Sequence, residues 1–206
     1  MPPFLSLVVL LLTAATSVGI LLAHHWRWLV IFLAAQYVGI FVLALQHLPL
    51  GMATVKVIAG WMGAAVLAMT RSNFEEEEDA SESLLPQGRL FRLIAAAIVN
   101  LVAFAAAPQV DAAMGGAGST VSSGSLLLIG MGLLHLGITD QPMRVTAGLM
   151  TVMAGFEVLY AAVENSVLVA ALLATINLGL ALTGAYLMTA ARAVDETAAE
   201  EEAEAA

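Results

Sequence analysis

Long apolar runs with few or no charged residues recur along the chain and are separated by polar segments. The first begins at Pro2 and continues for about 20 residues, which is the length a helix needs to cross a hydrocarbon layer about 30 Å thick. Only 11% of the residues are charged and 61% are hydrophobic, whereas soluble domains carry about 25% charged residues. The runs are continuous rather than alternating, so they do not resemble the strands of a membrane barrel. We therefore expect an all-α, polytopic transmembrane helical bundle.

Seven of these runs predict membrane spans, although the fifth is short and leaves six spans as the alternative. A signal peptide is a rival interpretation of the first run. It would open with a basic region and end at a small-residue cleavage site, whereas residues 24–28 read His-His-Trp-Arg-Trp. We expect a retained first helix. The predicted spans are residues 2–23, 29–45, 52–69, 90–107, 124–138, 143–163 and 167–190.

One long acidic connection divides the chain, and a second acidic run forms the tail. We expect both to be solvated and disordered, because blocks of like charge repel one another. The Gly-, Ala- and Ser-rich stretch 108–123 predicts an exposed loop on the side opposite this connection. The expected parts are an N-terminal three-helix part (1–70), an acidic cytoplasmic loop (71–89), a fourth helix with an outer loop (90–123), a three-helix unit (124–190) and an acidic cytoplasmic tail (191–206).

The basic residues predict the orientation. With seven spans all six arginines fall on one side, and the opposite loops contain neither Lys nor Arg. The positive-inside rule then places the N-terminus outside and the C-terminus in the cytoplasm of a multi-pass protein of a prokaryotic-type inner membrane. The arginines are Arg27, Arg71, Arg89, Arg92, Arg144 and Arg192.

One carboxylate, Glu157, stands inside the sixth span. It lies about 14 residues beyond Met143, or about 21 Å into the hydrocarbon layer. An ionisable group at that depth costs at least about 2.5 kcal/mol, so it predicts a functional site. Glu157 is our main candidate for a proton-handling group; a carboxylate satisfied by a neighbouring helix is the alternative. Gly148 and Gly155 lie on one face and predict close packing of this helix.

Two further charged residues are candidates for proton translocation. Glu164 lies two turns beyond Glu157 on roughly the same face, as either a solvated interfacial residue or a station between Glu157 and the outer surface. Lys56 lies in the third span at a similar depth below the outer surface. It either extends its amine to the interface or pairs with a carboxylate such as Glu157.

The remaining intramembrane polar candidates are single residues in four different spans. We expect interhelical hydrogen bonds from them, with the lining of a hydrated path as the alternative. The four histidines of the chain lack metal-ligand spacing, zero cysteines exclude thiolate sites, and no basic patch predicts nucleic-acid binding. These polar candidates are Gln36, Asn100, Asn177 and His135.

A resemblance to a known family follows from residues of the C-terminal unit. The motifs are Gly130-Met-Gly-Leu-Leu, then Arg144, then Gly148-Leu-Met, Gly155-Phe-Glu-Val-Leu-Tyr and Asn177-Leu-Gly-Leu-Ala-Leu. Together they resemble the small K-type subunit of NADH-quinone oxidoreductase (complex I). The same unit is similar to the C-type subunit of multisubunit cation/proton antiporters and to the C-terminal half of the E-type membrane subunit of group-four hydrogenases. The resemblance covers about residues 124–190.

The resemblance implies a role for one residue and a set of partners. Glu157 matches the family's second-helix glutamate, a residue of its proton path, whereas Thr175 stands where complex I carries another glutamate. That departure favours the hydrogenase-like or antiporter-like branches, or a chain whose translocation role is reduced. The additional N-terminal helices and the long cytoplasmic loop resemble the longer E-type hydrogenase subunit more than the compact K-type subunit. The resemblance implies a non-catalytic subunit that binds no cofactor itself, with redox centres and quinone in partner subunits.

Three functions follow as hypotheses. The first is a membrane-arm subunit of a complex I-like or hydrogenase-like ion-translocating oxidoreductase, embedded in the lipid bilayer beside antiporter-like subunits. The second is a subunit of a multisubunit cation/proton antiporter without a redox partner. The third is a structural or assembly membrane protein, or a small transporter, in which Glu157 only packs.

Overall fold

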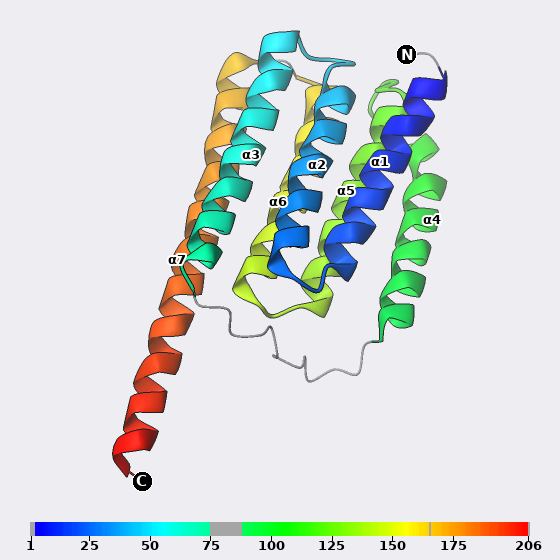
Figure 1. Ribbon diagram of the computed structural model, residues 1–206. Helices are drawn as coiled ribbons and strands as arrows, with labels where there is room; N and C mark the ends of the chain where they lie inside the picture. Colours follow the sequence, from blue (N-terminus) through cyan, green and yellow to red (C-terminus); the bar gives the residue numbers. More distant parts are fainter. Residues whose placement is uncertain (1–2, 75–87, 165, 206) are drawn as a thin grey trace.

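In the part of the chain that the structure describes, seven helices run up and down through one bundle (Figure 1). The computed structural model describes residues 3–74, 88–164 and 166–205, and within these ranges it contains helices and no strand. The expected all-α helical bundle is confirmed. The helices are α1 (Pro3–Leu22), α2 (Trp26–Ala44), α3 (Leu50–Ser72), α4 (Arg89–Ala113), α5 (Ser119–Ile138), α6 (Pro142–Ala161) and α7 (Val167–Ala205).

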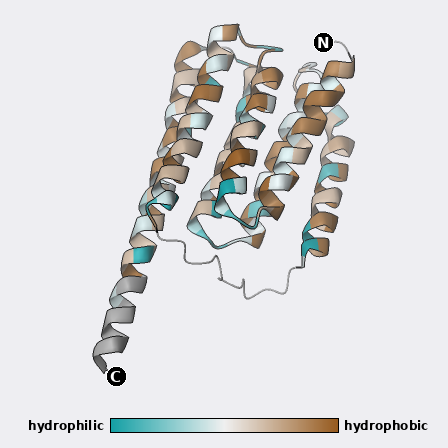
Figure 2. Ribbon diagram, in the orientation of Figure 1, coloured by the Kyte–Doolittle hydropathy of each residue, from teal (hydrophilic) through white to brown (hydrophobic). Residues whose placement is uncertain are grey.

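Six of the helices, all except α6, are long and apolar enough to cross a membrane. Arg144 and Glu157 lower the mean hydropathy of α6. This helix nevertheless buries 11 of its 20 residues, whereas α4 buries 3 of its 25. The outward faces of the bundle are mostly apolar, and hydrophilic residues gather toward one end (Figure 2). The chain is therefore a multi-pass membrane protein with α6 in its interior and α4 at its edge.

The order of packing explains why α6 is interior. It packs against α5, α2 and α7, while α3 packs along α7, and α4 packs on α5 and α1. Glycines permit these close approaches: a Cβ at Gly155 would stand 2.8 Å from the Ser125 carbonyl oxygen, and a Cβ at Gly132 2.9 Å from the Gly148 carbonyl oxygen. The predicted close packing of the sixth helix is confirmed.

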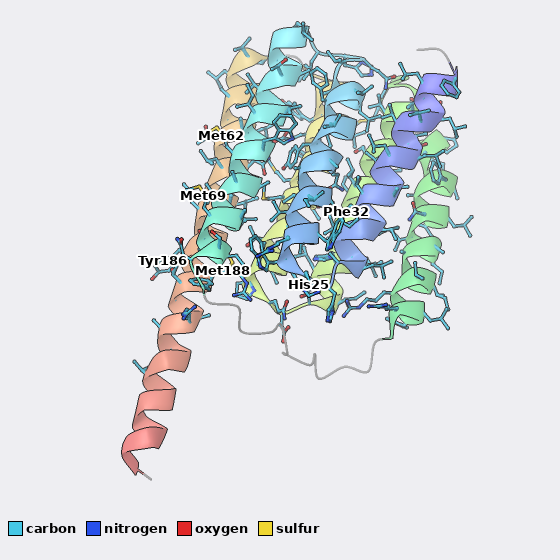
Figure 3. The ribbon with its side chains drawn as sticks, viewed as in Figure 1. His25, Phe32, Met62, Met69, Tyr186 and Met188 are labelled. Carbon is cyan, nitrogen blue, oxygen red and sulfur yellow. The ribbon has the colours of Figure 1, made fainter. Side chains whose placement is uncertain are left out.

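Some apolar side chains point outward from the bundle and others lie in its interior (Figure 3). Met62, Met69 and Tyr186 are exposed on the outward side of α3 and α7, whereas Met188 is buried. Phe32 of α2 lies against α1 at Gly19, where a Cβ would stand 2.7 Å from the ring. Apolar surface therefore covers the outside of the bundle, as contact with lipid requires.

All six arginines lie toward one end of the bundle, where α1, α3 and α5 end and α2, α4 and α6 begin (Figure 1). Arg192 follows far along α7, and its guanidinium stands 5.1 Å from the ring centroid of Phe74, just beyond the end of α3. We call this side the arginine end. The remaining basic residue of the chain is Lys56, which is buried. The predicted one-sided distribution of arginines is therefore present in the bundle.

The expected outer loop at 108–123 is wrong in extent. Helix α4 continues through Pro108 to Ala113, and α5 begins at Ser119, so only residues 114–118 connect them. Three glycines at positive φ make this short turn, because glycine adopts that region without a steric penalty. The fifth helix is thus a full 20 residues long rather than the shortest one.

The acidic tail also differs from the expectation of disorder. Helix α7 extends without interruption to Ala205. Its last part is rich in Ala and Glu, which are among the strong helix formers, and it is seeded by the preceding spanning helix. Most of the acidic loop, residues 75–87, lies outside the described residues.

Candidate functional site

A buried ion pair joins Lys56 and Glu157. The distance from Lys56 Nζ to Glu157 Oε2 is 2.9 Å, and the two side chains are 3% and 2% exposed. Lys56 lies six residues into α3 and Glu157 lies four residues before the end of α6, about 9 Å and 6 Å from the helix ends opposite the arginine end. The Lys56 amine therefore points to Glu157 in the interior rather than to the interface.

Small residues on α3 make room beside this pair. Gly60 follows Lys56 by one turn, and a Cβ there would collide with the ring of Tyr37 from α2. One turn further, a Cβ at Gly63 would stand 2.6 Å from Met150 Cε of α6. The glycine face of α3 thus brings Tyr37 and α6 side chains close to the buried lysine.

Two more polar groups complete what we call the ion-pair cluster: Lys56, Glu157, Tyr37 and Asn177. Asn177 of α7 donates a hydrogen bond from Nδ2 to the Tyr37 hydroxyl at 2.7 Å, and Glu157 interacts electrostatically with Tyr37. Glu157 Oε1 and Asn177 Oδ1 are buried without a hydrogen-bond partner among the described residues. Four helices therefore place a cation, a carboxylate and two unused acceptor oxygens together.

A small cavity lies beside the ion pair, on the side toward the end of the bundle opposite the arginines. Its volume is ≈ 10 Å3, about the least that holds one water molecule. Glu157 and Lys56 line it, and so do Glu164 and Ser166, which lie in the connection beyond α6. Glu164 is exposed, so the structure brings this predicted residue to the outward side of the same cavity.

Gln36 belongs to a separate, neutral group. Its Nε2 donates to Ser17 Oγ of α1 at 2.7 Å, and its Oε1 accepts from Thr151 Oγ1 of α6 at 3.2 Å. We call Ser17, Gln36 and Thr151 the glutamine cluster. It is fully buried, and each of its side-chain polar atoms has a partner. The predicted interhelical hydrogen bonding is confirmed for Gln36 and for Asn177.

Asn100 and His135 are not brought to the ion pair. Asn100 donates from Nδ2 to the Ala96 carbonyl of its own helix at 2.7 Å and to Met131 Sδ of α5 at 3.5 Å, so its expected interhelical hydrogen bond is also present. His135 is buried three residues before the end of α5, at the arginine end. Neither residue belongs to the ion-pair cluster.

The sequence did not single out Tyr37, Ser17 or Thr151. Tyr37 carried a usable signal, because it adjoins Gln36 inside an apolar span. Ser and Thr commonly bond a carbonyl of their own helix, as Thr151 does to Ala147 at 2.8 Å, so their second, interhelical role left no trace in the pattern.

The ion-pair cluster contains one carboxylate, one amine, one phenol and one carboxamide. Within the described residues no group of three His, Cys, Asp or Glu side chains is placed to hold a metal ion. Glu157 has one oxygen on Lys56 and one oxygen free to accept a proton. No family model, no curated protein and no solved structure matches the chain. The functional argument therefore starts from this cluster.

Proposed function

We propose that this chain is an ion-translocating membrane subunit in which the Lys56–Glu157 pair handles the transported proton. The observation that carries the proposal is the ion pair itself, 2.9 Å long and almost fully buried in a membrane bundle. Ionisable groups at membrane depth are costly and mark ion pathways. The cavity and Glu164 supply a route from the pair toward the end opposite the arginines.

The pair is a poor device for stability alone. Replacing a buried ion pair by apolar residues of similar volume is often neutral or stabilising, so retention of both charges needs another reason. When Glu157 takes up a proton, the Lys56 cation loses its counter-charge. Proton uptake is therefore coupled to a change in the position or hydration of the lysine, which is the coupling that a translocating subunit needs.

The resemblance of residues 124–190 gives this proposal its context. We place the chain in the membrane arm of a complex I-like or hydrogenase-like oxidoreductase of the inner membrane. In that arm it lies beside separate antiporter-like subunits. Redox centres and quinone belong to partner subunits in this proposal. By the positive-inside rule the arginine end faces the cytoplasm, so the cavity of the ion pair opens to the outside.

A cation/proton antiporter without a redox partner is the second candidate, and one observation favours it over a complex I-like subunit, although not over a hydrogenase-like one. Thr175 stands where complex I carries a second glutamate. It is exposed and donates only to the Ala171 carbonyl of its own helix at 2.9 Å. The ion-pair cluster therefore lacks the second carboxylate of the complex I path.

Two measurements test the proposal. The first is purification from the native membrane in mild detergent, with mass spectrometry of the bound proteins. Antiporter-like subunits together with iron–sulfur subunits would support the redox complex, and antiporter-like subunits alone would support the second candidate.

The second measurement is the proton flux of the Glu157→Gln variant. Asn100→Leu is the control, because Asn100 makes no contact with the ion pair. Unchanged flux in Glu157→Gln, or recovery of the chain alone, contradicts the proposal and leaves a structural protein.

A further inference from the structure

The end of α1, the start of α4, the end of α5 and the start of α6 lie at the arginine end of the bundle (Figure 1). Residues at these four helix ends line a second small cavity, away from the ion pair. Its volume is ≈ 20 Å3. The titratable side chains of its lining are all bases. The lining consists of Leu21 at the end of α1, Arg92 near the start of α4, His135, Ile138 and Thr139 at the end of α5, and Arg144 near the start of α6.

Two basic groups of this cavity have buried nitrogen atoms without a hydrogen-bond partner among the described residues. His135 is 4% exposed, and neither of its ring nitrogens makes a well-aligned hydrogen bond, although the ring faces the backbone of Arg144. Arg92 Nε is also buried and unpaired. Because about 90% or more of buried polar groups in proteins are satisfied, two such groups on one cavity indicate a ligand that supplies acceptor atoms.

Within the described residues, Arg92 donates a hydrogen bond to a neutral group. Its Nη1 donates to the Leu21 carbonyl at 3.4 Å, which is a long bond to a neutral oxygen. Arg144 is held in place by Gln141 Oε1 at 2.6 Å and the His24 carbonyl at 3.0 Å. Asp140, which is the acidic residue nearest to Arg144 along the chain, is exposed and does not line the cavity.

The helix termini add positive potential at the same place. Both α4 and α6 begin beside the cavity, and a helix N-terminus carries about half a positive charge. Two guanidinium groups, a histidine and two helix N-termini therefore converge on one point at the boundary of the membrane. This is the chemistry that recognises an anion, and Arg in particular binds phosphate oxygens in pairs.

We infer that the mouth of this cavity binds a phosphate group. The enclosed part holds only a water molecule, so the phosphate lies at the mouth, between the half-buried side chains of Arg92 and Arg144. Basic pockets between spanning helices bind anionic lipid headgroups, and exposed Phe91 and Leu133 offer apolar contacts for acyl chains. A lipid phosphodiester and a free phosphate present the same oxygens. The inference does not depend on ion translocation.

The test uses the full chain in nanodiscs of phosphatidylcholine, without and with phosphatidylglycerol, and phosphatidylcholine nanodiscs with inorganic phosphate. Binding is measured by titration of the thermal unfolding midpoint and by native mass spectrometry of retained lipid. Arg92→Gln is expected to weaken binding about fivefold, corresponding to about 1 kcal/mol for one basic residue at a membrane surface. Arg89→Gln is the matched control, because Arg89 is exposed on the same helix and does not line the cavity.

The arms distinguish the two sources of phosphate. A rise in the midpoint with phosphatidylglycerol alone identifies a lipid headgroup, and the same rise with inorganic phosphate identifies a free anion. The inference is overturned if neither raises the midpoint, or if Arg89→Gln weakens binding as much as Arg92→Gln. If Arg92→Gln does not fold, His135→Gln provides the same comparison, since His135 lines the cavity without being a charged partner in the fold.

Discussion

The interior of the bundle contains two polar clusters of opposite character. The glutamine cluster is neutral, joins α1, α2 and α6, and leaves none of its side-chain polar atoms without a partner. The ion-pair cluster joins α2, α3, α6 and α7, carries two charges, and leaves Glu157 Oε1 and Asn177 Oδ1 unpaired beside a cavity. The neutral cluster can only hold helices together, whereas the charged one has a proton acceptor and an opening.

Energetics sharpen the contrast. Hydrogen bonds between membrane helices contribute about 0.6 kcal/mol on average and about 1.7 kcal/mol at most. Removing one partner of a buried ion pair costs about 3–5 kcal/mol, because the other charge is left without compensation. The two clusters should therefore differ in their effect on stability, and only the charged one should affect transport.

The largest effect is expected for Lys56→Met. The change leaves the Glu157 carboxylate alone in the interior, and we expect the protein to lose about 3–5 kcal/mol of stability. Proton flux in proteoliposomes should disappear as well, because the counter-charge that couples uptake to movement is gone. Chemical unfolding in detergent and a pH-sensitive dye inside the liposomes measure the two effects.

The double variant Lys56→Met with Glu157→Leu is the control for this prediction. It removes both charges, so stability should return to within about 1 kcal/mol of the original protein. Flux should stay absent. A double variant that transports protons would contradict the role of the pair, even if its stability behaves as expected.

A smaller effect is expected for Gly60→Ala. The added Cβ collides with the ring of Tyr37 and forces it to move, which costs about 1–3 kcal/mol as overpacking does elsewhere. Gly179→Ala on α7 is the matched control, because nothing lies within 4 Å of its Cβ position. Thermal unfolding midpoints of both variants measure the effect. Equal midpoints would show that the packing of Tyr37 does not require glycine at position 60.

Gln36→Leu should cost less and leave transport intact. Leucine has a similar volume but gives up the bonds to Ser17 and Thr151, so we expect a loss of about 1–2 kcal/mol from two interhelical hydrogen bonds. Proton flux per folded molecule should equal that of the original protein. Loss of flux would mean that the glutamine cluster takes part in the path and that the contrast drawn above is wrong.

The sequence predicted the fold better than the ends of the helices. Apolar runs of spanning length revealed the helical bundle, because membrane helices satisfy their own backbone and need little else. The stretch 108–123 misled because glycine and serine favour turns in water. Within a bundle Ser122, Ser123 and Ser125 are buried on α5, where Ser125 donates to the Gly155 carbonyl at 2.6 Å.

The site was predictable in part. The cost of a charge in an apolar span singled out Glu157 and Lys56 one at a time, but their contact joins residues 101 positions apart and depends on how α3 and α6 are arranged. Tyr37 was missed although it adjoins Gln36, because its partners, Asn177 of α7 and Gly60 of α3, lie on other helices. The packing of the helices decides which residues of different helices meet, and this packing is not apparent from the order of the residues in the sequence.

The smallest effect on stability is expected for Glu164→Gln, which tests the opening that distinguishes the ion-pair cluster. Glu164 is exposed, so the change should alter stability by less than about 0.5 kcal/mol. On the proposed route, proton flux should nevertheless slow, because the change removes the exposed carboxylate that lines the cavity. Asp140→Asn, an exposed carboxylate at the arginine end, is the control and should leave the flux unchanged. Equal flux in both variants would show that protons do not reach Glu157 through Glu164. The cavity beside the ion pair would then have only a packing role, as the glutamine cluster has.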